Sequence, residues 1–281
     1  MKNIAILMAS FNGEEYIREQ IDSIVRQTYK CWDLYVRDDG SNDATIEIIK
    51  SYEQDYPNIH FVDDKVKHVG AKNSFIRLLS SIDSELYMFC DQDDVWLPTK
   101  IEHSVELLEA TEREYPDSPI VVHSDVTVVN DHLNILSQSY WKSAHVKPER
   151  YKSYNYLAIF CCVQGTTMLF NRRAKNMCYP LAEDIRMHDF WVATRVIRNG
   201  GKIVSLYEQT VLYRQHSNNV YGVSFGDSLK LYNKLRNIKE VFKVNADKYR
   251  YLRKDGYGGV LKYLWYRTKI FIFRFIVDRN E

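Results

Sequence analysis

LYMFCDQDDVW, residues 86–96, joins a continuous apolar run to three aspartates within four positions. The apolar run at 86–90 predicts a short strand buried on both faces, which is the pattern of a parallel sheet. Asp91, Asp93 and Asp94 follow at the carboxyl end of that strand, where open α/β sheets bind their ligands. Because clustered carboxylates repel one another, we expect a cation among them.

The spacing of the three aspartates predicts that their side chains do not all point the same way. Residues two apart on an extended chain point the same way, so Asp91 and Asp93 share a face while Asp94 points elsewhere. Two hard oxygen ligands with open coordination positions suit Mg²⁺ or Mn²⁺ carrying a phosphate. A calcium loop fits poorly, because Val95 and Trp96 occupy the places of a ligand and of the required glycine. A capping cluster at the start of the next helix is the structural alternative.

The first 125 residues alternate between two periodicities. Continuous apolar runs predict buried strands at residues 4–8, 32–36, 59–62, 86–90 and 120–125. Apolar residues at helical spacing predict helices that begin near residues 17, 46 and 75 and after Pro98. This βαβα order predicts an α/β fold with a mostly parallel, doubly wound, Rossmann-like sheet.

Composition excludes several classes of protein. The 281 residues hold 38 Lys and Arg against 37 Asp and Glu, so no global charge favours a nucleic-acid partner. A hydrophobic content of 45% is typical of a globular protein. The five cysteines contain no C-x-x-C pair and lie in apolar contexts, which predicts reduced thiols in a cytoplasmic protein. No uninterrupted apolar run reaches the roughly 18 residues of a spanning helix.

The second half of the chain has a more mixed pattern. Short strand patterns surround a helix expected at about 188–199, without repeats or a Pro/Gly-rich linker. We therefore expect one domain at 1–222, with a ligand-binding half at about 1–125 and an acceptor-side half at about 126–222. Residues 223–281 form a helical tail rich in basic and aromatic residues.

Polar clusters follow the first two predicted strands, ASFNGE at 9–14 and RDDGSND at 37–43. The chain has neither a G-x-G-x-x-G motif nor a Walker lysine loop, so the ordinary dinucleotide and P-loop interpretations fail. Asp38 and Asp39 could accept hydrogen bonds from a base or a ribose hydroxyl. A turn followed by a helix cap is the alternative for this segment.

Two further residues carry candidate chemistry. Asp189 lies near the start of the predicted helix in MHDFWVATRVIRNGG, 187–201. It is either a general base at the mouth of the sheet or a carboxylate that stabilises the helix dipole. His216 lies in the polar segment YRQHSNN, 213–219. A lone histidine there is either a metal ligand or simply packed or solvated.

Taken together and in order, six segments between residue 4 and about residue 222 resemble family-2 glycosyltransferases of the GT-A fold. They are ASFNGEEYIREQIDSIVRQTY (9–29), DLYVRDDGSNDAT (33–45), CDQDDVWLPTKIE (90–102), VQGTTMLFN (163–171), HDFW (188–191) and YRQHSNN (213–219).

The resemblance implies an inverting, metal-dependent transfer of a sugar from a nucleoside-diphosphate donor. The nucleotide would be bound by Ala9, Ser10, Phe11, Asn12, Asp38, Asp39, Lys72 and Asp91. Asp91 and Asp93 match the D-x-D motif and, with His216, would hold Mn²⁺ or Mg²⁺. Gly165 and Trp191 would lie on the acceptor side, and Asp189 matches the general base. Many relatives carry glutamate where this chain has His188.

The donor is predicted less sharply than the family. The combination of DQDDVW, HDFW and YRQH resembles the rhamnosyl-transferring branch, which implies dTDP-rhamnose, with a UDP-hexose such as UDP-galactose next. The expected acceptor is a hydroxyl of a growing surface polysaccharide or a lipid-linked glycan. A nucleotidyltransferase is one alternative, although the acidic ASFNGEEYIRE lacks its glycine-rich basic loop. A non-catalytic sugar-nucleotide-binding protein is the other.

The tail has an amphipathic pattern. Residues 247–281 carry nine Lys and Arg against four Asp and Glu. Wound as a helix, 260–277 gathers one apolar arc, made of Val260, Leu261, Leu264, Trp265, Phe271, Ile272, Phe275 and Ile276. Lys262 and Lys269 flank one side of it, and Arg267 and Arg274 flank the other. This arc either packs on the domain or attaches the protein peripherally to the inner face of the cytoplasmic membrane.

Overall fold

The computed structural model describes residues 1–182, 184–216 and 238–277, which form two units. The first unit comprises Met1–Tyr140 and Val163–Arg214, and the second comprises Trp141–Cys162 and Gln215–Glu281. The predicted boundary at residue 222 divides the chain differently, because it leaves 141–162 with the first part of the chain. Parts of the predicted tail, 223–237 and 278–281, lie outside the described residues.

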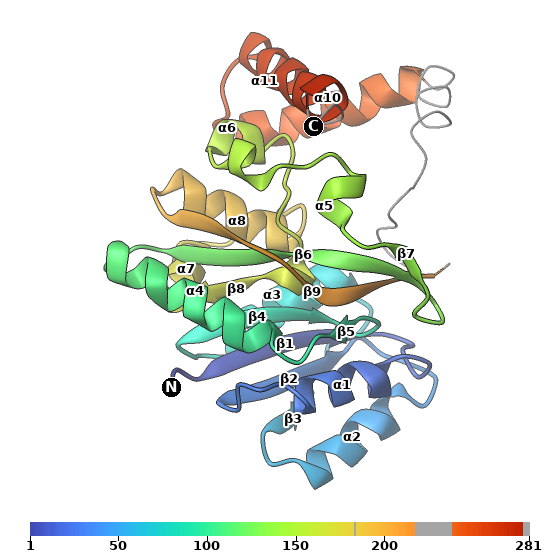
Figure 1. The fold of residues 1–281 in the computed structure, drawn as a ribbon. Helices are drawn as coiled ribbons and strands as arrows, with labels where there is room; N and C mark the ends of the chain where they lie inside the picture. Colours follow the sequence, from blue (N-terminus) through green and yellow to red (C-terminus); the bar gives the residue numbers. More distant parts are fainter. Residues whose placement is uncertain (183, 217–237, 278–281) are drawn as a thin grey trace. The chain divides into compact units, whose positions relative to one another are not determined.

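One sheet forms the centre of the first unit (Figure 1). Its strands are β1 (Ile4–Ser10), β2 (Trp32–Asp38), β3 (Ile59–Phe61), β4 (Leu86–Asp91), β5 (Val95–Trp96), β6 (Ile120–Asn130), β7 (Ile135–Ser137), β8 (Leu169–Asn171) and β9 (Lys202–Gln215). Over the described residues the strand order is β3-β2-β1-β4-β8-β6-β9-β5, and β7 pairs with β6. All five strands predicted in the first 125 residues are therefore confirmed.

The parallel part of the sheet ends at β4. Strand β1 pairs in parallel with β2 and β4, and β2 pairs in parallel with β3. Strand β8 lies next and runs antiparallel to both β4 and β6. The fifth predicted strand, β6, is thus separated from the parallel strands by a segment from much later in the chain. An apolar run predicts that a strand is buried on both faces, but it does not indicate which strand pairs with it.

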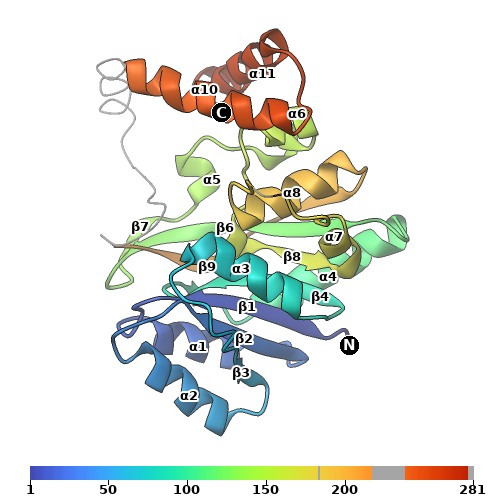
Figure 2. The same ribbon diagram turned by 180° about the vertical axis from the view of Figure 1, so that it is seen from behind.

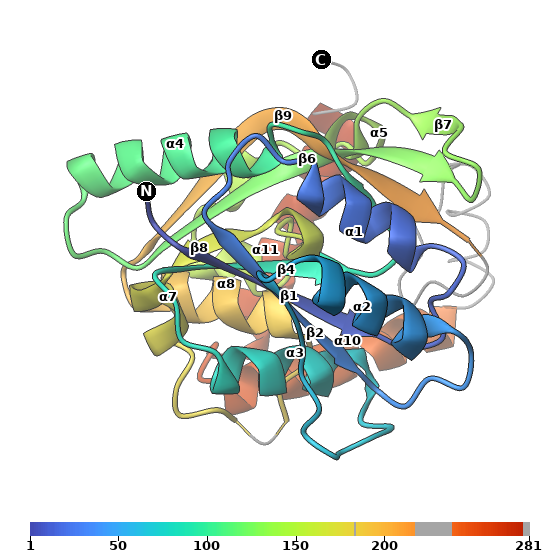
Figure 3. The same ribbon diagram turned by 90° about the horizontal axis from the view of Figure 1, so that it is seen from below.

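Helices cover both faces of this sheet (Figures 2 and 3). They are α1 (Ile17–Val25), α2 (Thr45–Asp55), α3 (Gly70–Ser81), α4 (Lys100–Glu114), α7 (Arg172–Asn176) and α8 (His188–Arg198). One face packs against α1, α2 and α4, whose buried isoleucines and leucines join one core cluster with strand residues such as Ile6 and Met8. The other face packs against α3 and α8, where Phe75 meets Phe89 edge to face. Each fully buried apolar side chain stabilises the fold by about 1.5–3 kcal/mol.

The second unit is helical. Its elements are α5 (Tyr140–Ser143), which begins at the unit boundary, η1 (Pro148–Tyr151), α6 (Tyr154–Leu157), α10 (Ile238–Lys254), α11 (Val260–Ile272) and the π-helical turn η3 (Phe273–Val277). Tyr257 Oη donates to the carbonyl of Asn155 at 2.8 Å, and Tyr154 Oη donates to the Asp255 carboxylate at 2.9 Å. These bonds explain why residues 141–162 belong with the tail.

The five cysteines form no disulfide, as the sequence predicted. Among the described residues, no helix has both the length and the apolar character needed to cross a bilayer.

Candidate functional site

The carboxyl ends of β1, β2 and β4 bring predicted residues from separate stretches together. Ala9 of β1 is in register with Asp91 of β4, and Ser10 is in register with Asp38 of β2. The Ser10 hydroxyl donates to Asp38 Oδ2 at 3.1 Å. This edge of the sheet therefore places the first polar loop beside the aspartate motif.

Asp38 and Asn12 hold the loops at this edge in shape. Asp38 Oδ1 accepts the backbone N–H groups of Gly40 at 2.9 Å and Ser41 at 2.7 Å, and Oδ2 accepts the Ser41 hydroxyl at 2.5 Å. Asn12 Oδ1 accepts the backbone N–H of Asn42 at 3.0 Å. Both oxygens of Asp38 are thus used within the protein, which supports the turn interpretation of this segment. The N-cap residue of α2, Ala44, makes no side-chain cap. Direct nucleotide contact by Asp38 or Asn12 stays a prediction.

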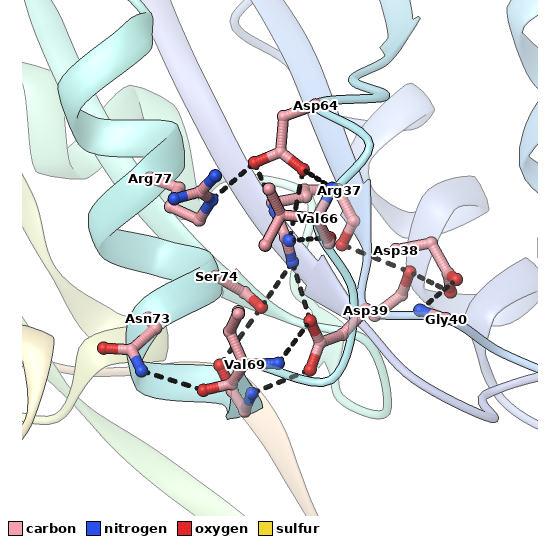
Figure 4. A network of polar contacts seen from close by, with 12 residues as sticks. Arg37, Asp38, Asp39, Gly40, Asp64, Val66, Val69, Asn73, Ser74 and Arg77 are labelled. Carbon is pink, nitrogen blue, oxygen red and sulfur yellow. Dashed lines mark hydrogen bonds and ion pairs between the residues drawn. The ribbon is translucent and has the colours of Figure 1, made fainter.

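Asp39 fastens the loop that precedes α3 to the end of β2 (Figure 4). Its Oδ1 accepts the backbone N–H of Val69 at 3.0 Å, and its Oδ2 accepts that of Gly70 at 2.7 Å. Arg37 Nη1 also donates to Oδ1 at 3.0 Å. Burial opposes ionisation of Asp39, but these hydrogen bonds outweigh it and lower the pKa of the carboxyl. The start of α3, including the half-buried Lys72, is thereby held at the site.

Arg37 organises this region and was missed by the sequence analysis. It is 1% exposed, and its guanidinium also donates to Ser74 Oγ at 2.8 Å and to both oxygens of Asp64. Arg77 pairs with the same Asp64 carboxylate at 2.6 Å. The arginine within RDDG could have indicated this role, because a charged residue that is buried in an apolar strand needs an oppositely charged partner.

Three carboxylates share the end of β4. Asp91 is half-buried, and burial raises its pKa to about 7, with the nearby carboxylates of Asp93 and Asp189 adding to the effect. Carboxylates gathered in this way suit a divalent cation, and the predicted metal site stays a prediction. In the described part of the chain, however, no group of three or more His, Cys, Asp or Glu could hold a metal ion. His216 falls in the second unit, so its predicted part in metal binding stays a prediction.

Asp94 turns into the protein, whereas the sequence predicted only that it points elsewhere than Asp91 and Asp93. It is fully buried, and its Oδ1 accepts the backbone N–H of Arg214, at the end of β9, at 3.1 Å. The Arg214 side chain donates from Nε to the carbonyl of Asp93 at 2.7 Å and pairs with Glu19 of α1. Arg214, at the end of β9, thus fixes the aspartate turn between β4 and β5.

Gln92, between the two predicted ligands, ties their turn to the first polar loop. The backbone N–H of Phe11 donates to Gln92 Oε1 at 2.9 Å, and Gln92 Nε2 donates to the Phe11 carbonyl at 3.0 Å. A Cβ at Gly13 would overlap the Gln92 amide, so a larger residue there would displace Gln92 from its two hydrogen bonds with Phe11. The ring of Phe11 is 47% exposed and lies edge-on to His68, with ring centroids 6.1 Å apart.

Asp189 is oriented by two backbone groups. Its Oδ2 accepts the N–H of Gly165 at 3.2 Å, and its Oδ1 accepts the N–H of Phe190 at 2.6 Å. Gly165 begins the short 3-10 turn η2 (Gly165–Thr167), which contacts the end of β4. The structure therefore brings together Asp189, Gly165 and Asp91, which the sequence predicted from three separate motifs.

His188, the departure from the family pattern, is part of the core. Its ring stacks on Phe75 of α3 with centroids 4.0 Å apart and meets Phe89 of β4 edge to face at 4.5 Å. Burial lowers the pKa of His188 to about 4, so the ring is neutral near pH 7. It supports the backbone that carries Asp189.

Trp191, predicted on the acceptor side, lies in the core. Its side chain is 2% exposed, and its Nε1 donates to the carbonyl of Cys178 at 3.0 Å. Arg195 lies 3.9 Å from the centre of its ring. Trp191 lies two residues after Asp189 on a helix, so its side chain points to a different side.

Comparison with known proteins identifies one family. Residues 5–175 match the model of Glycosyl transferase family 2. The chain is 28% identical over 253 residues to dTDP-rhamnosyl transferase RfbG of Shigella flexneri, covering 84% of this chain and 83% of that protein. It is 23% identical over 240 residues to the UDP-Glc:alpha-D-GlcNAc-diphosphoundecaprenol beta-1,3-glucosyltransferase WfaP of Escherichia coli, covering 85% and 87%.

Two solved structures share the fold. One is S. aureus TarS 1-349 in complex with UDP-GlcNAc, with a TM-score of 0.57 at 17% identity over 80% of this chain and 62% of that one. The other is the mannosyltransferase PcManGT from Pyrobaculum calidifontis in complex with GDP-Man and Mn²⁺, with a TM-score of 0.56 at 14% identity. This second match covers 78% of this chain and 58% of the mannosyltransferase chain.

Proposed function

The chain belongs to glycosyl transferase family 2 and is a transferase that acts on nucleotide sugars, and from this premise we propose an inverting, metal-dependent sugar transfer. One observation carries the proposal. Burial raises the pKa of Asp91, and the carboxylates of Asp93 and Asp189 lie close enough to add to the effect, at the sheet edge that also holds the loop after β1. A cation, a donor diphosphate and a base can meet there.

The residues take separate roles in the reaction. Held by Asp91 and Asp93, Mn²⁺ or Mg²⁺ would supply positive charge that offsets the charge developing on the departing nucleoside diphosphate. Asp189 accepts the proton of the acceptor hydroxyl while that oxygen bonds to the anomeric carbon. The bond from the anomeric carbon to the diphosphate oxygen breaks on the opposite face, so the configuration inverts. The backbone N–H groups of Gly165 and Phe190 keep the Asp189 carboxylate aimed.

The favoured donor is dTDP-rhamnose, with a UDP-hexose such as UDP-galactose next. The named activity of RfbG supports the first choice, and the named activity of WfaP supports a UDP-sugar. On the nucleotide side, Phe11 presents an exposed ring beside His68, which lies in the loop that Asp39 holds. An aromatic ring there offers a stacking surface for either base.

The proposed acceptor is a hydroxyl of a growing surface polysaccharide or lipid-linked glycan. The WfaP name includes a diphosphoundecaprenol-linked sugar, which supports a lipid-linked acceptor by analogy. Such an acceptor lies at a membrane surface. We therefore place the enzyme in the cytoplasm, at the inner face of the membrane.

The test is release of nucleoside diphosphate from a panel of dTDP-rhamnose, UDP-galactose, UDP-glucose and GDP-mannose. Each donor is incubated with Mn²⁺, with Mg²⁺ and with EDTA. We expect turnover of dTDP-rhamnose that EDTA abolishes. Asp93→Asn keeps the shape of the side chain but removes an anionic ligand, so it should abolish the metal-dependent part of donor binding.

Turnover that is equal with EDTA and with Mn²⁺ would refute the metal role. Preference for a UDP-hexose would replace the donor and leave the enzyme class intact. Binding of donors without any turnover, with and without a lipid-linked acceptor, would favour a sugar-nucleotide-binding protein.

A further inference from the structure

Helix α11 and η3 turn an apolar face outward. Along the described chain, no other segment exposes so many large apolar side chains. The exposed residues are Val260, Leu261, Leu264, Trp265, Phe271, Ile272 and Ile276, and we call them the α11 face. Leu261 is 80% exposed and Trp265 is 60% exposed. Seven of the eight residues in the arc predicted from the sequence are therefore exposed. The side chain of Phe275 lies outside the description.

The opposite side of α11 holds the helix in place. Tyr263 and Ile270 are buried, and the ring of Tyr263 packs against Tyr249 and Tyr257 with centroids 5.3 and 6.3 Å apart. Tyr266 receives a hydrogen bond from Asn155 Nδ2 at 3.2 Å. Packing within the second unit thus uses the side of the helix away from the arc. The seven described side chains of the arc are therefore not part of the packing within the second unit.

Charge around the α11 face has a single sign. Residues 256–277 contain four basic residues and no aspartate or glutamate. Lys262 and Lys269 lie beside aromatic rings, 5.1 Å from the centre of Tyr257 and 4.8 Å from the centre of Trp265. Arg267 flanks the other side of the face on the helical wheel. Arg274 is instead held within the second unit, where its Nη2 donates to the Ala144 carbonyl at 2.8 Å. An apolar strip bordered by cations on both sides complements an anionic lipid surface.

We propose that the α11 face docks on an anionic bilayer, with its apolar side chains among the acyl chains and its Lys and Arg at the headgroups. The docking itself is argued from the α11 face alone. Only its biological purpose, which is to hold the enzyme beside a lipid-linked acceptor, rests on the proposed function. A second copy of the chain is a poorer occupant. A two-fold pair through this face would set like charges against each other with no carboxylate between them.

The test uses the full chain and vesicles of phosphatidylglycerol and phosphatidylethanolamine, with phosphatidylcholine vesicles as the neutral comparison. We expect co-sedimentation with anionic vesicles that weakens as salt rises. Leu261→Ser with Leu264→Ser should lower the partition coefficient at least tenfold. The matched control is Ile135→Ser with Leu136→Ser, which removes two exposed apolar side chains from β7 and should leave binding unchanged.

The charge arm compares two double variants with the same change in net charge. Lys262→Glu with Lys269→Glu should abolish binding to anionic vesicles, whereas Lys30→Glu with Lys50→Glu, on the first unit, should leave most of it. The proposal is wrong if the full chain stays in the supernatant with anionic vesicles at low salt. It is also wrong if the α11 variants bind as well as their controls, or if they dissociate a dimer seen by gel filtration.

Donor hydrolysis without vesicles separates this proposal from the proposed function. An α11 variant that loses vesicle binding but keeps nucleoside diphosphate release supports the surface as a docking site. A chain that binds vesicles but hydrolyses no donor would count against the proposed function alone.

Discussion

Gly165→Ala adds one methyl group beside Asp189, the proposed general base, and tests how that carboxylate is held in place. The new Cβ would lie 2.9 Å from His188 Nε2 and 3.5 Å from Asp189 Cβ. The His188 ring cannot turn away, because it is buried between Phe75 and Phe89. The η2 turn must therefore move, and the bond from Gly165 N–H to Asp189 Oδ2 lengthens from its present 3.2 Å.

The expected magnitude follows from these contacts. Inserting a methyl group into a well-packed region costs about 1–3 kcal/mol of folding stability. A hydrogen bond to an ionised group contributes about 1.5–3 kcal/mol, and its loss lets the carboxylate leave its productive orientation. Since each 1.36 kcal/mol is a factor of ten in rate, we expect kcat to fall by roughly 10- to 100-fold. The donor KM should change little, because η2 contributes none of the predicted nucleotide contacts.

The assay measures kcat and KM for the donor through nucleoside diphosphate release, together with thermal unfolding. Gly259→Ala is the matched control, since no atom lies within 4 Å of its added Cβ and its φ is not positive. A Gly165→Ala enzyme with kcat within twofold of wild type and an unchanged Tm would refute the packing argument. A raised donor KM at unchanged kcat would instead assign the η2 turn to donor binding.

Three further substitutions test the site. Asp189→Asn should lower kcat by roughly 10²–10⁴-fold at unchanged donor KM, measured in the same assay; a raised KM without a fall in kcat would make Asp189 a binding residue. His188 has a pKa of about 4 in the fold against about 6.5 unfolded, so below pH 6.5 the unfolded state takes up the proton first. The free energy of unfolding of the wild type should therefore fall by about 2 kcal/mol more between pH 7 and pH 5 than that of His188→Phe. Urea unfolding of both proteins at the two pH values measures this difference. Arg214→Lys keeps the charge but loses the planar guanidinium that reaches both Asp93 and Glu19. Calorimetry should therefore show that the affinity of metal-dependent donor binding falls at least tenfold. An unchanged affinity would make Arg214 purely structural.

Much of the fold and of the candidate site followed from local pattern. The apolar runs predicted every strand of the parallel half, and each polar cluster stood at the carboxyl end of its strand. Because parallel strands end at one edge, the joining of Ala9, Asp38 and Asp91 could be expected before the structure was known. The two-residue period of an extended chain predicted only that Asp94 points elsewhere than Asp91 and Asp93, and its burial is known from the structure.

Other residues of the site could not be predicted in this way. Arg37 and Arg214 read as ordinary charged residues, and only the fold shows that they are buried among carboxylates and carbonyls. Trp191 is buried, because a helical residue two positions from Asp189 can face the core, and its acceptor-side role stays a prediction. The unit boundary differs from the predicted one because residues 141–162 pack with segments about 100 positions away.

By itself, the sequence determined the alternation of strands and helices, the order of the family's motifs and the apolar arc of the tail. Each of these is a local property, carried by residues within one or two turns or strands of each other. Only the tertiary structure decided that β8 lies between β4 and β6, and that η2 contacts Asp189. It also decided that α11 buries Tyr263 and Ile270 and leaves the arc exposed. Periodicity marks a face of a helix, but what covers that face depends on packing partners that are distant in the chain.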